Sequence, residues 1–411
     1  MKALVFGTEP DGWQPPADAP PLMRNLAVSP VGLRDVPDAT PLRPDWLVVR
    51  PLLTGICGSD SKQVLLDFGE GGADSAMIAF CSFPQVLGHE VVGEVVSLGP
   101  EADGFGVGDR VVLNPWLSCR PRGIEPICPS CEAGDLSLCW SFTVGDISAG
   151  IHTGVAADAT GGYAELLPAH SSMLHRVPDG VPNEQAVFAD PFSVSLHAIT
   201  RNPPPPGGKA LVWGAGSLGC CAVAILRTLY PDVEVAVVAR FPQQAALAKE
   251  LGAHLVTSHE PAEQVLETLA QWSGGVLRRH PDQPGLPMCH PGFVDVAYDT
   301  VGKPDSAAIS ARLLTTHGTI VKAGVHAPAR WEWSPLDFKE LRWVGSNAFG
   351  IETVNGERKH AMEHYLDLAE AGRVDLSAML THVFSLAHWR DAFCTIADQE
   401  HSGAIKVAIR P

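Results

Sequence analysis

The stretch KALVWGAGSLGCCAVAILRTL, residues 209–229, holds a short apolar run, a glycine-rich turn and a longer apolar segment. Lys209–Trp213 predicts a buried strand, and Cys220–Leu229 predicts the apolar helix that follows the turn. The next apolar run, Val233–Ala239, predicts a second strand. Because a strand, a helix and a strand in this order form a parallel unit, the stretch predicts a doubly wound α/β sheet.

The turn between strand and helix has the glycine spacing of a dinucleotide site. Gly214 allows the tight turn, Gly216 lets the backbone approach a pyrophosphate, and Gly219 lets helix and strand pack closely. The helix N-terminus supplies free N–H groups for the phosphates. Taken alone, a glycine triplet could be any tight turn, but both strands and the helix are also present. We therefore predict a cofactor site that includes Gly214, Gly216, Ser217, Leu218 and Gly219.

The end of the second predicted strand indicates which cofactor binds. An acidic residue there would bind the 2′-hydroxyl of NAD, but the chain has Ala239 followed by Arg240. An arginine can pair with the 2′-phosphate of the phosphorylated cofactor. These two residues favour NADP(H) over NAD(H), with a solvated surface role for Arg240 as the alternative.

Charge and composition exclude several classes of partner. The chain has 411 residues, 46 acidic and 29 basic side chains and a formal net charge of −17. This balance argues against nucleic acid or an anionic membrane as the partner. There is no apolar core of a signal peptide at the N-terminus and no apolar run near the roughly 20 residues that span a bilayer. We expect a cytoplasmic protein whose cysteines stay reduced, so clustered cysteines indicate metal binding or catalysis.

Outside the glycine-rich region the pattern changes along the chain. Residues 1–185 read as β-rich, and Asn183–Arg201 predicts a helix. Ser273–Pro291 is rich in Gly, Pro and His and predicts a long surface loop. An amphipathic helix is predicted at Lys359–Ala371. Further strands are predicted at Val294–Tyr298, Thr319–Ala323, Trp343–Ser346 and Ala404–Ile409.

Three cysteines have the spacing of a closed zinc site. Cys128, Cys131 and Cys139 lie within twelve residues of one another, and zinc in structural sites prefers four tetrahedral ligands, often thiolates. We choose Cys119 as the fourth ligand, with Glu125 as the alternative. Reduced thiols without a metal are the remaining possibility.

A second set of candidate ligands is dispersed, and a resemblance unites it. The motifs Gly55–Asp60 (GICGSD) and Gly88–Gly93 (GHEVVG), the cysteine lobe and the glycine turn occur in this order. In these motifs nearly the whole chain resembles the zinc-dependent medium-chain alcohol dehydrogenase family, in particular its sorbitol- and threonine-dehydrogenase-like branch. The resemblance implies a GroES-like β-rich catalytic domain, residues 1–185 and 350–411, and a Rossmann domain with a doubly wound parallel sheet, residues 186–349.

The resemblance also implies roles for individual residues. Cys57 and His89 would bind a catalytic zinc, Asp190 would be the third protein ligand, and Glu90 would lie in or next to the ligand set. Asp60 is a candidate for orienting a ligand, or else makes ordinary turn hydrogen bonds. Ser59 would relay the hydroxyl proton, and Lys62 stands where many relatives have a proton-passing histidine. By the same resemblance Ala323, Gly324, Val325 and Asn347 border the nicotinamide.

These observations predict an NADP(H)-dependent zinc oxidoreductase acting on an alcohol or carbonyl compound, with zinc as Lewis acid. The alternatives are an NAD-dependent polyol or amino-alcohol dehydrogenase and a catalytically silent cofactor-binding redox sensor. The partner would be a small molecule, and the resemblance implies a homodimer or homotetramer.

Two segments are longer than the resemblance leads us to expect, near residues 63–83 and 274–292. The first is apolar and contains Gly69, Gly71 and Gly72. It either forms part of the wall of the substrate mouth together with Trp116, or it is a surface insertion.

Overall fold

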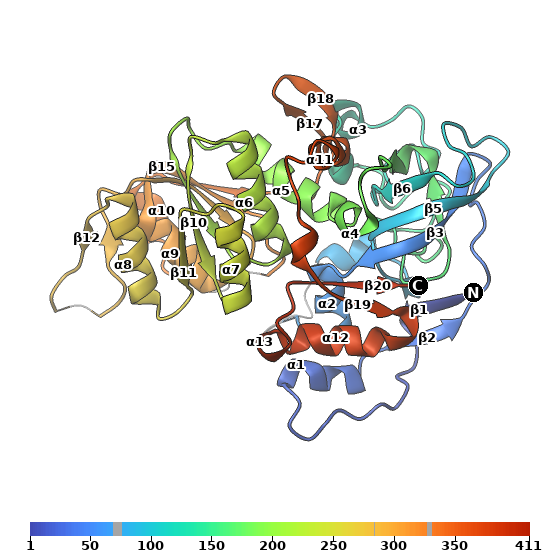
Figure 1. Ribbon diagram of the computed structural model, residues 1–411, viewed down its shortest axis with the longest axis horizontal. Helices are drawn as coiled ribbons and strands as arrows, with labels where there is room; N and C mark the ends of the chain where they lie inside the picture. The colour runs from blue at the N-terminus through green and yellow to red at the C-terminus, as the bar shows by residue number, and fades with distance from the viewer. Residues whose placement is uncertain (69–75, 283, 327–330) are drawn as a thin grey trace. The chain divides into compact units, whose positions relative to one another are not determined.

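The computed structural model describes residues 1–68, 76–282, 284–326 and 331–411. The chain divides into two compact units, residues 1–190 with 359–411 and residues 191–358 (Figure 1). Gly69, Gly71 and Gly72 of the predicted insertion lie outside the described residues. In the described part of that segment, Met77 and Ile78 lie on a 3₁₀ turn and are exposed.

The first unit is built on two sheets. The larger sheet has the order β19-β20-β3-β5-β6-β8, with β7 also paired to β3, and the smaller has the order β2-β1-β4. Their strands are Lys2–Phe6 (β1), Val31–Asp35 (β2), Trp46–Gly55 (β3), Gln85–Val86 (β4), Glu90–Leu98 (β5), Arg110–Leu113 (β6), Leu167–His170 (β7), Leu174–Arg176 (β8), Leu380–Ser385 (β19) and Lys406–Arg410 (β20). Most pairs are antiparallel, which suits a sheet of short strands joined by turns.

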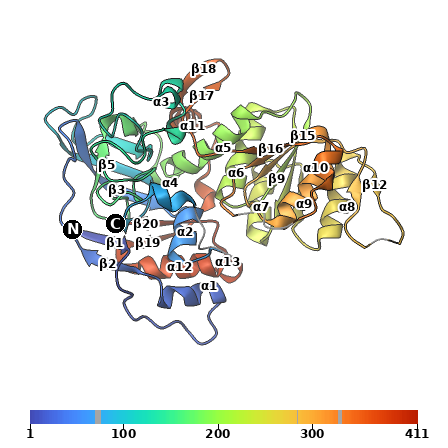
Figure 2. The same cartoon turned by 180° about the vertical axis from the view of Figure 1, so that it is seen from behind.

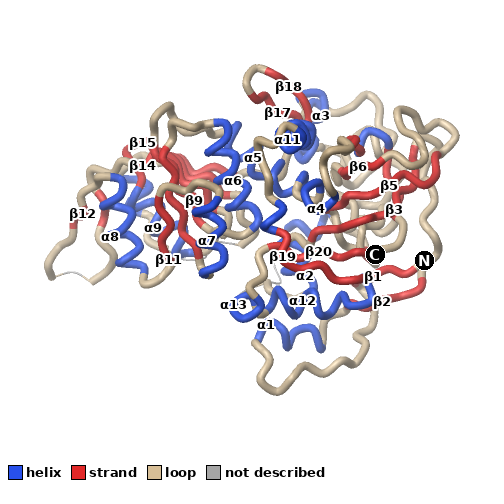
Figure 3. The backbone as a smooth tube through the Cα atoms, viewed as in Figure 1, coloured by secondary structure: helices blue, strands red, loops and turns tan. Residues whose placement is uncertain are grey.

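Short helices cover these sheets. α12 packs on β19 and β20 and lies beside α1, over a core that includes Leu4, Trp389 and Phe393 (Figures 1 and 3). The helices of this unit are Pro21–Arg24 (α1), Gly58–Val64 (α2), Pro129–Ala133 (α3), Asn183–Ala186 (α4), Ala361–Glu370 (α11), Trp389–Ala397 (α12) and Gln399–Ser402 (α13). α5 (Ala189–Arg201) begins in this unit and continues into the second.

The second unit is a six-stranded sheet whose neighbouring strands are all parallel. The strand order is β11-β10-β9-β14-β15-β16. Successive strands are added outward from β9 on one side and then from β14 on the other, and doubly wound sheets bind dinucleotides at this switch point. The strands are Lys209–Trp213 (β9), Glu234–Ala239 (β10), Leu255–Ser258 (β11), Val294–Asp299 (β14), Leu314–Lys322 (β15) and Arg342–Gly345 (β16). The predicted doubly wound domain is confirmed.

Helices pack on this sheet in pairs (Figures 1 and 2). α6 and α7 contact each other and strands β9–β11, and α8 and α9 contact each other and strands β11, β14 and β15. Their bounds are Ser217–Leu229 (α6), Pro242–Glu250 (α7), Ala262–Ser273 (α8), Pro304–Leu313 (α9) and Ser334–Phe338 (α10). A separate strand pair, Ile351–Val354 (β17) and Glu357–His360 (β18), precedes α11.

Two sequence predictions were wrong in detail. The helix predicted over Asn183–Arg201 is divided into α4 and α5. Pro191 explains the break, because proline lacks an N–H group and is tolerated in the first turn of a helix, so a new helix begins just before it. The predicted loop Ser273–Pro291 contains a short antiparallel pair, Leu277–Arg278 (β12) with Met288–Cys289 (β13).

No helix in the described ranges is both long and apolar enough to cross a membrane.

Candidate functional site

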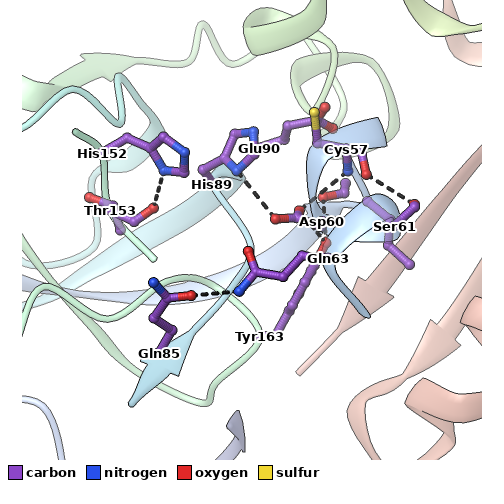
Figure 4. Close-up of polar contacts among 12 residues, drawn as sticks. Cys57, Asp60, Ser61, Gln63, Gln85, His89, Glu90, His152, Thr153 and Tyr163 are labelled. Atoms are coloured by element: carbon purple, nitrogen blue, oxygen red, sulfur yellow. Dashed lines mark hydrogen bonds and ion pairs between the residues drawn. The ribbon is translucent and has the colours of Figure 1, made fainter. Parts of the chain in front are cut away.

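Strand pairing brings together Cys57, His89 and Glu90, which are far apart in sequence. Cys57 follows β3 and immediately precedes α2, while Glu90 begins β5 and His89 immediately precedes that strand. β3 and β5 pair with Gly55 opposite Glu90, which places the three side chains side by side (Figure 4). One potential ligand atom from each residue lies within 4.8 Å of the others. A thiolate, an imidazole and a carboxylate at one point are a donor set that fits a catalytic zinc.

Asp60 and Tyr163 orient the imidazole of His89. The Asp60 Oδ1 atom lies 3.6 Å from His89 Nδ1, and Tyr163 donates a 2.8 Å hydrogen bond to Asp60 Oδ2. Burial opposes charge on both Asp60 and His89, but their mutual attraction outweighs it. The pKa of Asp60 is therefore lowered and that of His89 is raised well above its usual value. With Nδ1 facing a carboxylate, Nε2 remains for a metal, as in carboxylate–histidine–zinc arrangements.

A buried lysine holds Glu90. Lys406, the first residue of β20, forms an ion pair with Glu90 and donates a 2.9 Å hydrogen bond to the carbonyl oxygen of Ile56. Both charged side chains are only 2% exposed. Sequence reasoning missed Lys406, although a single lysine inside the apolar run Ala404–Ile409 could have pointed to it.

Asp190 is buried on the first turn of α5. Burial raises its pKa to about 7, with Glu90 adding to the shift and the charges of His89 and Lys406 opposing it. Its carboxylate is not in the group of ligand atoms that lie within 4.8 Å of one another. Ser59 and Lys62 both lie on α2 and are partly exposed.

His152 also lies at this cluster, although no sequence motif pointed to it. Its ring centroid is 4.6 Å from that of His89 and 5.7 Å from that of Trp116. Burial and the neighbouring His89 lower the pKa of His152 to about 3, so the ring is neutral.

The cysteine lobe forms a second donor cluster. Ligand atoms of Cys119, Cys128, Cys131 and Cys139 lie within 4.8 Å of one another, and the Sγ atoms of Cys119 and Cys139 are 3.6 Å apart. The alternative ligand, Glu125, is exposed and is not in this group. Four sulfur donors at one point fit a closed structural zinc site.

Backbone N–H groups point at these sulfur atoms. Cys128 N donates to Cys119 Sγ at 3.3 Å, Trp140 N to Cys128 Sγ at 3.5 Å and Ser141 N to Cys139 Sγ at 3.3 Å. Such donors stabilise thiolates. Burial opposes the thiolate of Cys128, but hydrogen bonds from the backbone N–H groups of Trp140 and Cys131 and from the neighbouring thiols outweigh it and lower the pKa of the thiol to about 6.

Arg122 lies between Cys119 and Cys128 in the sequence of the lobe and is fully buried. Its guanidinium group donates hydrogen bonds to the carbonyl oxygens of Leu117, Val144, Ile147, Ser148 and Gly150. One side chain therefore ties together the two ends of the segment that carries the thiols.

The glycine turn of the second unit has space for a phosphate. Gly214 has a φ of +96°, and a Cβ atom on Gly219 would lie 1.9 Å from the carbonyl oxygen of Gly214. Neither position therefore accepts a side chain. At Gly216, which precedes α6, an added Cβ would meet nothing within 4 Å. The open space in front of this helix N-terminus fits a dinucleotide pyrophosphate.

The other predicted cofactor residues lie at the same edge of the sheet, because the strands are parallel. Ala239 ends β10, and the exposed Arg240 follows it with its guanidinium carbon 4.9 Å from the ring centroid of Phe241. Ala323, Gly324 and Val325 follow β15. Ser217 and Leu218 begin α6, and Asn347 lies just beyond the end of β16.

Comparison with known families gives two matches. The model described as "Alcohol dehydrogenase GroES-like domain" matches residues 43–179, and "Zinc-binding dehydrogenase" matches residues 217–369. The predicted GroES-like and Rossmann architecture is thereby confirmed.

Similar proteins are named as dehydrogenases and reductases. The probable diacetyl reductase 2, (R)-acetoin forming, of Saccharomyces cerevisiae is 27% identical over 387 residues, covering 90% of this chain and 84% of that protein. The (R,R)-butanediol dehydrogenase of the same yeast is 25% identical over 388 residues, covering 92% and 94%. Among solved structures, RspB of Escherichia coli CFT073, an alcohol dehydrogenase complexed with NADH, has a TM-score of 0.72 and 22% identity. The match covers 100% of this chain and 99% of that one.

Proposed function

Because the chain belongs to the zinc-dependent medium-chain alcohol dehydrogenase family, we propose that it interconverts a secondary alcohol and its ketone, or a primary alcohol and its aldehyde, with NADP(H). In the oxidative direction a hydride passes from the carbinol carbon to NADP⁺ and the hydroxyl group loses its proton. The products are the carbonyl compound, NADPH and one proton. The observation that carries this proposal is the donor set of the half-buried Cys57 with the buried His89 and Glu90.

The residues at and around the donor set have different proposed roles in binding the metal. Cys57 and His89 would hold zinc, with Asp190 proposed as a third ligand. A bound zinc supplies a Lewis acid that lowers the pKa of the alcohol. Asp60 keeps His89 in the orientation that ligation needs. Lys406 binds the carboxylate of Glu90 and so opposes its ligation of the metal.

Ser59 is proposed to receive the hydroxyl proton at its Oγ atom. It lies on the first turn of α2, two residues after Cys57, and is partly exposed. Lys62, one turn further along the same helix, is proposed to lead the proton to solvent or to bind a cofactor oxygen. Removal of the Ser59 hydroxyl would slow proton transfer without removing a metal ligand.

Arg240 supports the choice of NADP(H). It follows the C-terminal end of β10 next to Ala239, where an acidic residue would favour NAD(H). The guanidinium group can bind a 2′-phosphate in a bidentate manner, through two parallel N–H···O hydrogen bonds. Arg240→Ala should lower kcat/KM for NADPH about 10- to 100-fold and leave NADH within about threefold.

A screen of alcohols and carbonyl compounds with both cofactors tests the proposal. Arg279→Ala is the matched control for Arg240→Ala, because Arg279 is an exposed arginine of the same unit that pairs with Glu263. A clear preference of the wild-type enzyme for NADH would contradict the cofactor assignment. It would favour the second candidate, an NAD-dependent polyol or amino-alcohol dehydrogenase. Assembly as a homodimer or homotetramer stays a prediction that light scattering would test.

A further inference from the structure

His152 occupies a position that the proposed chemistry does not yet use. Its ring packs against the ring of His89, with centroids 4.6 Å apart and planes inclined at 51°. On another side it meets the edge of Trp116, with planes at 88° and a backbone bridge between the two residues. Figure 4 shows the two imidazole rings side by side, with Cys57 and Glu90 close to His89. His152 is therefore held in place beside the donor set.

The hydrogen bond of His152 determines which of its nitrogen atoms is available. Nδ1 lies 2.7 Å from the carbonyl oxygen of Thr153. A carbonyl oxygen can only accept, so Nδ1 carries the proton and donates it. In a neutral imidazole the other nitrogen then has a lone pair, which makes Nε2 a hydrogen-bond acceptor. The backbone of Thr153 thus presets His152 to receive a hydrogen bond.

His152 is neither a metal ligand nor an ordinary core residue. It does not belong to the group of ligand atoms that gathers Cys57, His89 and Glu90. It is also partly exposed, whereas the adjoining Trp116 is 7% exposed and Thr153 is fully buried. A fixed acceptor on a half-buried side chain, next to a proposed ligand of the metal, suits contact with a bound molecule.

We propose that His152 is a substrate-binding residue whose Nε2 accepts a hydrogen bond from a second polar group of the substrate, adjacent to the reacting carbon. This inference rests on the proposed function, in which the reacting oxygen is held at the Cys57–His89–Glu90 cluster. A vicinal diol, an α-hydroxy ketone or an α-amino alcohol has such a donor, and a simple secondary alcohol lacks it. His152 then selects substrates by this second group, because a site built to pair a polar group disfavours the analogue without it.

The test compares 2,3-butanediol with 2-butanol, which has the same carbon chain and one hydroxyl group fewer. The wild-type enzyme should prefer the diol in kcat/KM. His152→Phe keeps a flat ring against Trp116 but removes the acceptor. It should lower kcat/KM for the diol about tenfold and leave 2-butanol within about threefold. His152→Gln, which can place an amide oxygen near the position of Nε2, should recover part of the preference.

Two further measurements separate substrate binding from a packing role. Zinc per chain should be the same in wild type and His152→Phe, and calorimetry without cofactor should show weaker binding of 2,3-butanediol to the variant. His401→Phe is the matched control, since His401 is a 78% exposed histidine of the same unit. It should leave all three readouts unchanged.

Contrary outcomes are distinguishable. A variant that turns over both alcohols with wild-type efficiencies, or that loses zinc and both activities in parallel, would overturn the assignment of His152 and leave the proposed function standing. If the wild-type chain turned over no alcohol and no carbonyl compound with either cofactor, the proposed function itself would be wrong, and the inference would fall with it.

Discussion

The two donor clusters of the first unit are assembled in different ways. All four thiols of the lobe come from residues 119–139, and Arg122 donates hydrogen bonds to carbonyl groups on both sides of this segment. Cys57 and Glu90 instead meet through the register of β3 with β5, and Lys406 is 316 positions from Glu90 in sequence. The lobe is a local structure of like ligands, whereas the other cluster exists only when distant strands have paired. We therefore expect a metal in the lobe to stabilise the fold and a metal at the Cys57–His89–Glu90 cluster to take part in the reaction.

The largest expected effect separates the clusters by activity. Cys57→Ala removes a proposed ligand of the reactive metal and should lower kcat at least about a thousandfold, because several kcal/mol of charge stabilisation would be lost. Cofactor binding, measured by quenching of protein fluorescence, should persist because the glycine turn lies in the other unit. Wild-type turnover by Cys57→Ala in metal-free buffer would contradict the zinc mechanism.

The converse substitution tests the lobe. Cys131→Ala should release the structural metal and lower the free energy of unfolding by about 4 kcal/mol, because binding of a structural metal contributes directly to folding. Metal analysis should show one zinc per chain in this variant and two in the wild type, and urea unfolding should show the loss of stability. A variant as stable as the wild type would mean that the lobe holds no metal. Cys81→Ala is a control, since Cys81 lies outside both clusters.

A smaller effect is expected at the ion pair beside the reactive cluster. Lys406→Met leaves the buried Glu90 carboxylate without its partner and should cost about 3 kcal/mol of stability. The double variant Lys406→Met with Glu90→Gln removes both charges and should recover most of that loss. Urea unfolding of the four proteins in a double-mutant cycle measures the coupling. Additive effects would show that the two side chains do not stabilise each other.

The smallest effect concerns a buried histidine outside both clusters. His360 precedes α11, and its Nδ1 atom accepts a hydrogen bond from Met362 N. Burial, with the neighbouring His175 and His364, lowers its pKa well below the usual value. As the pH falls through about 6.5, the unfolded chain binds a proton that the folded chain refuses, so stability falls.

The measurement is unfolding at several pH values. His360→Asn keeps a cap that can accept the same hydrogen bond. It should flatten the pH dependence below about 6.5 by up to about 1.4 kcal/mol per pH unit. An unchanged slope in this variant would show that His360 is protonated in the folded protein.

The chemistry of single segments was predictable from sequence, and contacts set by distant pairing were not. The glycine turn and the lobe thiols have short spacings that carry their own physical reason, whereas Cys57 and His89 were united only by the family resemblance. Lys406 and Tyr163 reach the cluster only through strand pairing and loop packing; a lone lysine in the apolar run Ala404–Ile409 is unusual, but the run does not show which carboxylate Lys406 pairs with. His152 sits in a stretch without periodicity, so only the ring contacts with His89 and Trp116 single it out. Similarly, Pro191 was visible in sequence, but its effect on the helix required knowledge of where the first turn begins.

The burial of Arg122 has a consequence for the charge of the lobe. Four thiolates around one divalent cation leave an excess of negative charge inside a poorly solvated segment. Guanidinium stays protonated in proteins, and the charges of Cys139 and Cys119 favour the cation of Arg122. The same side chain that ties the carbonyl groups together therefore acts as an internal counter-ion. A neutral residue of similar shape in place of Arg122 would remove this compensation. The lobe with its metal bound would then carry a larger uncompensated charge than the lobe without metal.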